Sequence, residues 1–218
     1  MTTPSVSVEP AYPAVSIRGV PTDKVWRLFS AGNYPYFLRM VHEIQEGFCP
    51  FCQIDTKLNV PIPGIDNRFW NVWDNPISKL PNQDYQFVIP LRRHATHYTE
   101  LSHLERIEVF NVFSALDVHF GITGGACVAR WGNPLRCARS QEHFHFNYHV
   151  PNGTGVVHPW IAKDPAGLER KKLILEAFEV LRNIQESSGC SPEEACQKLP
   201  STEQRKLVEN LLTTEGRC

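Results

Sequence analysis

The sequence lacks the features that would assign it to a membrane-spanning or secreted class. No apolar run approaches the length of about 20 residues that spans a bilayer. The first residues, MTTPSVSVEPAYPAVS, show no basic start followed by an apolar block, so a secretory signal peptide is not expected. A net charge of −1 provides no bulk attraction to nucleic acid or to an anionic membrane surface. These absences predict a soluble, cytoplasmic protein.

Internal repeats and low-complexity runs are also missing, and so is a disulfide pattern. The seven Cys are an odd number, and only Cys49 and Cys52 lie close together in the chain. Most are therefore expected to be free thiols of a reducing compartment. With 218 residues, of which 42% are hydrophobic, the chain suits one compact domain with extensions or two small domains.

Residues 143–151, HFHFNYHVP, are the most informative stretch of the chain. Polar and apolar side chains alternate strictly, which is typical of a strand with one apolar face. The polar face carries His143, His145, Asn147 and His149. Pro151 ends the strand because it has no N–H for a sheet hydrogen bond. A row of imidazoles can bind a metal, act as a nucleophile or move protons near neutral pH. The alternative is a solvated sheet face that happens to be rich in His.

Cys49 and Cys52 form a Cys-x-x-Cys pair, whose two thiolates can hold one tetrahedral zinc ion. The competing interpretations are a redox dithiol and a chance spacing. A redox dithiol lies at the start of a helix in a βαβ context, which is missing here. Zinc requires two further ligands, and the candidates are His94, His97 and the His-rich strand.

Hydrophobic periodicity predicts the elements around these motifs. Strands are expected over residues 69–73, 85–90 and 126–131, and helices over residues 36–44, 102–120, 168–185 and 201–212, with another that starts at Ser191. In the clearest helix, Ser102 and Glu105 form a capping box and Gly121 is the stop. Its apolar stripe is interpreted as core-facing and comprises Leu104, Ile107, Val109, Phe110, Val112, Phe113 and Leu116.

Three segments carry a resemblance to a known family: FVIPLRRHATHYTELS, VARWGNP and SQEHFHFNYHVP. With the Cys pair ahead of them, they resemble the histidine triad (HIT) superfamily of nucleotide hydrolases and transferases. The match covers residues 49–163 and leaves both ends unexplained. It implies an α+β fold in which a long helix packs on an antiparallel sheet, often paired as a dimer. The expected organisation is an N-terminal arm over residues 1–40, a HIT-like catalytic domain over 41–163 and a helical extension over 164–218.

The resemblance also implies roles for individual residues. His145, the middle position of the triad, would be the nucleophile on the α-phosphorus of a nucleotide. In zinc-containing branches of the superfamily, a structural zinc ion is held at the positions of Cys49, Cys52, His94 and His143. Ser140 falls on a phosphate-contacting position and Asn75 on one that contacts ribose. In the polar loop before the His-rich strand, Asn133 and Gln141 are further candidates for contact with the substrate.

One departure from the triad concerns Asn147, which stands where the family has its third His. Uridylyltransferase relatives carry Gln there, and a carboxamide can donate a hydrogen bond to a phosphoryl oxygen but cannot share a proton. His149 is the residue that could compensate. Hydrolysis, phosphorolysis, transfer and loss of activity all stay open. Two other classes do as well: a metal-dependent hydrolase whose His143, His145 and His149 bind a water-activating metal, and a nucleotide-binding module without catalysis.

Overall fold

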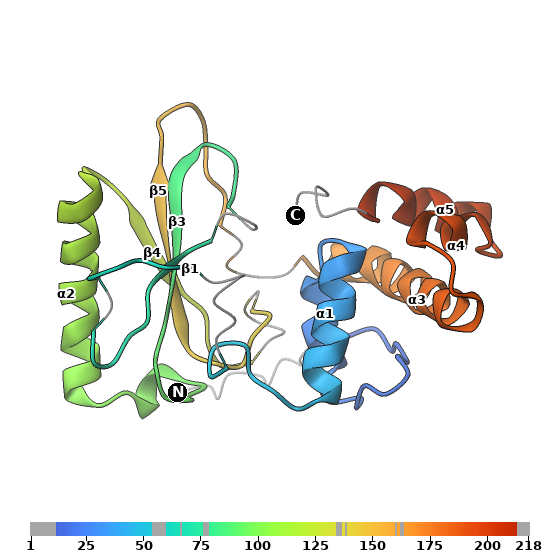
Figure 1. Cartoon of the computed structure of the whole chain (residues 1–218), viewed down its shortest axis with the longest axis horizontal. Helices are drawn as coiled ribbons and strands as arrows, with labels where there is room; N and C mark the ends of the chain where they lie inside the picture. The colour runs from blue at the N-terminus through green and yellow to red at the C-terminus, as the bar shows by residue number, and fades with distance from the viewer. Residues whose placement is uncertain are drawn as a thin grey trace, which may run out of the picture.

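The computed structural model describes residues 12–53, 60–65, 67–75, 79–133, 137, 139–159, 161 and 164–212. They form an antiparallel sheet with a long helix on one face, beside a group of helices built from both ends of the chain (Figure 1). The predicted α+β class and the helical C-terminal extension are therefore confirmed. In the described part of the chain, no helix is long and apolar enough to span a bilayer.

The sheet has five strands in the order β1-β2-β3-β5-β4, and every pair is antiparallel. The strands are β1 (Val60–Pro61), β2 (Trp73–Asp74), β3 (Gln83–Pro90), β4 (Ala126–Ala129) and β5 (His145–Pro151). The His-rich strand β5 lies between β3 and β4, so its side chains are flanked on both sides. The strand expected over residues 69–73 is shorter than predicted, because Asn67 Oδ1 accepts the N–H groups of Phe69 and Trp70 in a turn.

Helix α2 (His103–Phe120) begins and ends where the sequence predicts. Ser102 Oγ accepts the N–H of Glu105, the Glu105 carboxylate accepts the N–H of Ser102, and Gly121 adopts the left-handed conformation with φ of 63°. The predicted core stripe is wrong in part. Its buried members are Val109, Val112 and Leu116, whereas Leu104, Ile107 and Phe110 are exposed.

The spacing of the apolar residues explains this difference. A step of three residues falls short of a full helical turn by about 60°, so five positions at that spacing turn by about 240° around the axis. Such a series cannot face one side. The residues that face the sheet instead follow steps of three and four, from Val109 to Val112 and Leu116.

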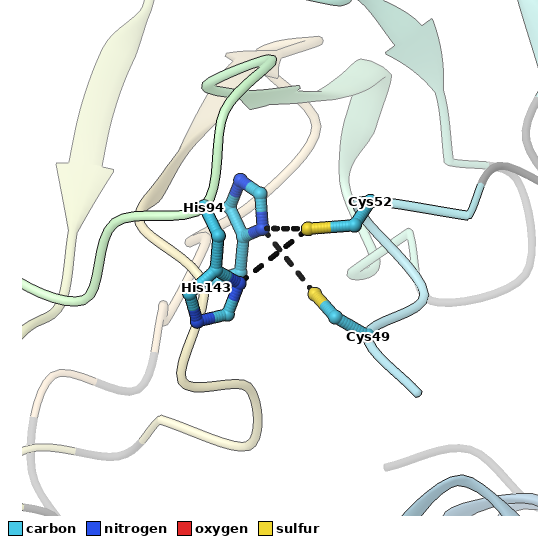
Figure 2. A group of neighbouring side chains, drawn as sticks. All are labelled: Cys49, Cys52, His94 and His143. Atoms are coloured by element: carbon cyan, nitrogen blue, oxygen red, sulfur yellow. Dashed lines mark hydrogen bonds between the residues drawn. The ribbon is translucent and has the colours of Figure 1, made fainter. Parts of the chain in front are cut away.

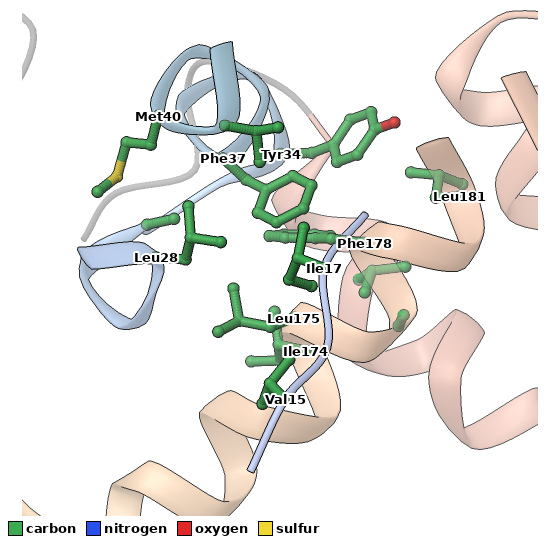
Figure 3. Close-up of a cluster of buried hydrophobic side chains, with 14 of the residues drawn as sticks. Val15, Ile17, Leu28, Tyr34, Phe37, Met40, Ile174, Leu175, Phe178 and Leu181 are labelled. Carbon is green, nitrogen blue, oxygen red and sulfur yellow. The ribbon is translucent and has the colours of Figure 1, made fainter. Parts of the chain in front are cut away.

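The remaining helices pack into one group, which we call the helical body: residues 12–46 together with residues 164–212. It contains η1 (Val25–Ser30), α1 (Tyr34–Gln45), α3 (Pro165–Ser188), α4 (Pro192–Gln197), α5 (Thr202–Val208) and η3 (Glu209–Leu211). A further 3₁₀ turn, η2 (Tyr98–Glu100), precedes α2. The helical body has a hydrophobic core of its own, in which α1 faces α3 (Figure 3).

This packing bears on the expected N-terminal arm. Residues 15–44 contribute buried side chains to the same core as the C-terminal helices, and the expected boundary at residue 40 falls inside α1. The reason is the i, i+3, i+4, i+7 series Phe37, Met40, Val41 and Ile44, which gives α1 one apolar face that must be covered. The three-part division remains a prediction, but its first two parts are joined by this helix.

Phe178 provides a test of this core. Its ring lies 5.3 Å from those of both Tyr34 and Phe37, measured between centroids, and it is fully buried. We expect Phe178→Ala to lower the free energy of unfolding by about 3–5 kcal/mol, because the cavity cannot collapse among fixed rings. Urea denaturation measures the effect. The control on the same helix is Leu173→Ala, 44% exposed, which should change stability by about 0.5 kcal/mol or less. Equal losses in the two variants would contradict the packing.

Candidate functional site

Four side chains from three segments meet beside the start of β5: Cys49, Cys52, His94 and His143 (Figure 2). Their ligand atoms all lie within 4.8 Å of one another. The Nδ1 atom of His143 is 3.3 Å from Cys49 Sγ and 3.4 Å from Cys52 Sγ, and Cys52 Sγ is 3.4 Å from His94 Nδ1. A tetrahedral zinc ion with bonds of 2.0–2.3 Å separates its ligand atoms by about 3.3–3.8 Å. The cluster can therefore hold one four-coordinate metal ion.

The orientation of His143 is fixed by a backbone carbonyl. Its Nε2 lies 2.6 Å from the oxygen of Leu91, which can only accept, so the hydrogen is on Nε2 and the lone pair is on Nδ1. Burial lowers the pKa of His143 to about 4, so the ring is neutral, as a metal ligand must be. Burial and, second, the charge of the Cys49 thiolate raise the pKa of Cys52 to about 11. A bound cation would lower the pKa of this thiol again.

His97, the other candidate ligand, lies outside this cluster. Its Nδ1 accepts the N–H of Thr99 at 3.2 Å and so caps the turn η2. His97 is three positions after His94 in the sequence, but it caps η2 and its ring lies away from the cluster.

The rest of the histidine row lies on the face of β5 opposite the apolar rings that pack toward α2. His145, Asn147 and His149 are only 6%, 6% and 5% exposed, which rules out the solvated sheet face considered from the sequence. The ring of Phe51 covers this end of the row, with its centroid 4.8 Å from that of His145. Three polar side chains are thus enclosed in a protein interior.

Hydrogen bonds set the tautomers of both imidazoles in the row. His145 Nδ1 donates to the backbone oxygen of His143 at 2.8 Å, which leaves the lone pair on Nε2. His149 Nδ1 donates to Gln83 Oε1 at 2.9 Å, and Gln83 in turn donates from Nε2 to the carbonyl of Leu80 at 3.3 Å. The Leu80 carbonyl fixes the orientation of the Gln83 amide, so His149 also keeps its lone pair on Nε2. His143 and His145 therefore have opposite tautomers.

Burial and nearby cations keep these rings neutral. Burial is the main cause that lowers the pKa of His145 and of His149 to about 4. The positive charge of Arg130 acts on both rings in the same direction, and that of Arg139 acts on His145. A neutral imidazole with a lone pair on Nε2, near two guanidinium groups, is suited to attack an anionic electrophile.

Asn147 lies between the two imidazoles, and its side chain contains a hydrogen-bond donor that is not used within the described residues. Its Nδ2 is buried and has no hydrogen-bond partner among the residues that the structure describes. A buried donor without a partner is costly to keep, and such groups are frequent where a ligand supplies the partner. The amide is thus suited to donate to an oxygen atom of a bound substrate.

The other residues predicted to contact the substrate differ in how they lie relative to the histidine row. Asn75 is near the row, since its N–H donates to the carbonyl of Gln86, which pairs with His149 across the sheet. Asn133 uses its backbone oxygen to accept the N–H of Cys137 at 3.2 Å. The Ser140 carbonyl and the Gln141 side chain are bound by Arg27 of the helical body, at 3.2 and 2.7 Å. The structure therefore directs the Gln141 amide toward the helical body.

Of three comparisons with known proteins, only the search of solved structures found matches. No family model matches the sequence, and no curated protein matches it. Among solved structures, a member of the HIT family from Bacillus subtilis is 15% identical, with 71% of this chain and 99% of that one covered and a TM-score of 0.39. A Zn-bound histidine triad family protein from Mycobacterium smegmatis is 16% identical, with 62% and 95% covered and a TM-score of 0.37. The diadenosine triphosphate hydrolase of Plasmodium falciparum is 13% identical, with 56% and 81% covered and a TM-score of 0.33.

Two of these solved structures are described as HIT or histidine triad family proteins, and the resemblance of this chain to that superfamily rests on its own residues.

Three residues around the histidine row were not predicted from the sequence: Phe51, Arg130 and Arg139. Arg130 could have been found. Ala126 pairs with His149 and Val128 with Asn147, so the next residue in the alternation, Arg130, belongs to the histidine face. Phe51 lies between the two cysteines of the Cys-x-x-Cys motif, which specifies no residue at its position. Arg139 lies in a loop without periodicity, so no pattern assigns it to the histidine face.

Proposed function

We propose that this chain is a HIT-type enzyme, a nucleotide phosphoanhydride hydrolase or nucleotidyltransferase that acts at the α-phosphate through a nucleotidyl-His145 intermediate. The observation that carries the proposal is the tautomer of His145. Its Nδ1–H is held by the backbone oxygen of His143, so the Nε2 lone pair is available in a buried site. Dinucleoside polyphosphates and nucleotide conjugates are the substrates that this chemistry suits.

The reaction divides one difficult displacement into two easier ones. Nε2 of His145 attacks the α-phosphorus, a P–N bond forms, and the bond from phosphorus to the leaving oxygen breaks with its electron pair on that oxygen. Water or another hydroxyl group then attacks phosphorus, loses its proton to solvent, and returns the P–N electron pair to Nε2. Asn147 Nδ2 donates to a non-bridging oxygen, and the charge of Arg130 stabilises the transition state.

Zinc is the metal that fits the cluster of two thiolates and two imidazoles. Cys49, Cys52, His94 and His143 would complete a tetrahedral shell with no open position, so the ion would be structural. It would join the segment after α1 to the start of β5. The alternative site with three His ligands is not favoured, because His143 turns its Nδ1 toward the cysteines.

Intact-mass spectrometry tests the proposed reaction. The protein is incubated with dinucleoside polyphosphates and, separately, with nucleotide sugars, and each sample is quenched at neutral and at acid pH. We expect a mass gain of one nucleotide that survives the neutral quench and is lost in acid, as a phosphorus–nitrogen bond would be. The substrate that gives the adduct names the substrate class. Binding without adduct or turnover would replace the enzyme by a nucleotide-binding module.

A homodimer remains a prediction, and the exposed face of α2 is the surface that we propose for it. Leu104, Ile107 and Phe110 are exposed there, and Phe110 is 66% exposed. Strand β4, at the edge of the sheet, lies near the same helix (Figure 1). Burial and then the charge of Asp117 on α2 raise the pKa of the Cys127 thiol on this strand. An open strand edge beside an apolar helix face can pair with its own copy around a two-fold axis.

Phe110→Glu tests this surface. We expect the unsubstituted chain to have twice the mass of 24.9 kDa by size-exclusion chromatography with light scattering. A buried unpaired carboxylate on each side of the interface should shift the variant to the single-chain mass. Val156→Glu, at a site 69% exposed and outside α2, is the control that should stay dimeric. A single-chain mass for the unsubstituted protein would overturn the dimer.

A further inference from the structure

Residues 139–142, which lead into His143, are held by the helical body at every position. Ser30 Oγ donates to the carbonyl of Arg139 at 3.3 Å, and the guanidinium of Arg139 lies 5.1 Å from the ring centroid of Trp26. Lys24 Nζ donates to both carboxylate oxygens of Glu142, at 2.7 and 2.9 Å. All three partners lie in or next to η1, a segment outside the part of the chain that resembles a known family.

In the middle of this segment, Ser140 and Gln141 join a buried network that contains charged side chains. Arg27 donates from Nε to the carbonyl of Ser140 at 3.2 Å, and from one terminal nitrogen to Glu43 at 3.0 Å and to Gln141 Oε1 at 2.7 Å. Gln141 Nε2 closes the ring by donating to Glu43 at 3.1 Å. Glu43 is fully buried, and removing a donor from a buried carboxylate is strongly destabilising. A closed buried network of this kind admits one arrangement of its members.

Two members of this network, Glu43 and Gln141, are close in the chain to residues of the Cys/His cluster. Glu43 lies near the end of α1, its carbonyl accepts the N–H of Phe48 at 3.1 Å, and Cys49 follows. Gln141 is two residues before His143. A cavity of about 250 Å³ is lined by both groups: the network residues Arg27, Glu43 and Gln141 and the cluster residues Cys49, His94 and His143. Arg27 thus joins the segment that carries the thiolates to the segment that carries the imidazole.

We infer that Arg27 is a positioning residue of the metal centre. Paired with Glu43, it fixes Gln141 so that His143 meets Cys49 and Cys52 before any ion binds. The inference rests on the metal site of the proposed function but not on the nucleotide reaction. The helical body would then be part of the machinery that sets the geometry of the site, and of His145 two residues further on.

Cobalt(II) titration tests the inference without any nucleotide. Bound in a tetrahedral site with thiolates, Co²⁺ gives ligand-field and thiolate charge-transfer absorption whose shape reports its geometry. The first variant is Gln141→Met, which removes the link to the His segment and no charge. The second is Arg27→Met with Glu43→Met, which replaces the ion pair by apolar groups and so leaves no buried charge unpaired. Circular dichroism and thermal melting check that each variant is folded.

The matched control is Arg39→Met. Arg39 also donates to Glu43, at 2.9 Å, but makes no hydrogen bond or ion pair with residues 139–142 among the residues that the structure describes. We expect Co²⁺ affinity to fall about 10- to 100-fold in Gln141→Met and in the double variant, with altered ligand-field absorption, and to be unchanged in Arg39→Met.

Unchanged affinity and spectrum in Gln141→Met would overturn the inference, and this variant decides the question if the double variant fails to fold. Equal losses in Arg39→Met would also overturn it, because they would show a general effect on the helical body. So would the absence of Co²⁺ binding by the unsubstituted protein. The nucleotide reaction can fail independently, since a protein that binds Co²⁺ as expected and forms no adduct contradicts only the proposed reaction.

Discussion

Replacing His145 by Ala is expected to abolish the nucleotidyl adduct and to lower turnover by about 10⁴-fold or more, the scale of loss seen when a nucleophile is removed. The expectation follows from the arrangement of the row. No other imidazole can replace His145, because His143 is directed toward the cysteines and His149 lies four residues away along β5. Intact-mass spectrometry detects the adduct, and single-turnover kinetics with the substrate so identified measures the rate.

Two further variants make this result interpretable. His119→Ala, at an exposed position of α2, should leave both the adduct and the rate unchanged. His149→Ala should still form the adduct, because His149 lies four residues from the nucleophile along β5. An adduct of normal yield in His145→Ala would show that another residue is the nucleophile, and peptide mapping of that adduct would identify it.

Replacing Cys49 by Ser is expected to remove the metal ion and the stability that the ion provides. A hydroxyl group is a much poorer zinc ligand than a thiolate, and the three ligands left could not complete the tetrahedral shell. Free zinc at 100 times its dissociation constant stabilises a folded protein by about 2.7 kcal/mol, and more at higher excess. Thermal melting with and without a chelator measures this contribution, and elemental analysis measures the zinc content.

The unsubstituted protein should carry one zinc ion per chain and melt at a lower temperature after chelation. Cys49→Ser should melt at the same lower temperature with or without chelator. Cys127→Ser is the matched control, because Cys127 is exposed on β4 and absent from the cluster. One zinc ion per chain in Cys49→Ser, with an unchanged melting temperature, would contradict the assignment of the cluster as a metal site.

Several parts of the fold and the site are determined by the sequence alone, because they depend on local chemistry. Alternation over residues 143–151 set β5 and its two faces, since side chains of a strand point to opposite sides. Ser102 and Glu105 fixed the start of α2 through contacts within four residues. The Cys49–Cys52 spacing identified half of the four-residue cluster that can hold a metal ion, and the family resemblance supplied His94 and His143.

Only the tertiary structure decided the properties that depend on distant contacts. The sequence predicted that Leu104, Ile107 and Phe110 face the core, but the orientation of α2 on the sheet exposes them. An N-terminal arm was expected, yet α1 packs on α3, which begins 120 positions after the end of α1. The tautomer of His143 is set by Leu91 and that of His149 by Gln83, which belong to other segments. Periodicity shows which face a side chain joins, but the partner on that face is determined by where the chain returns.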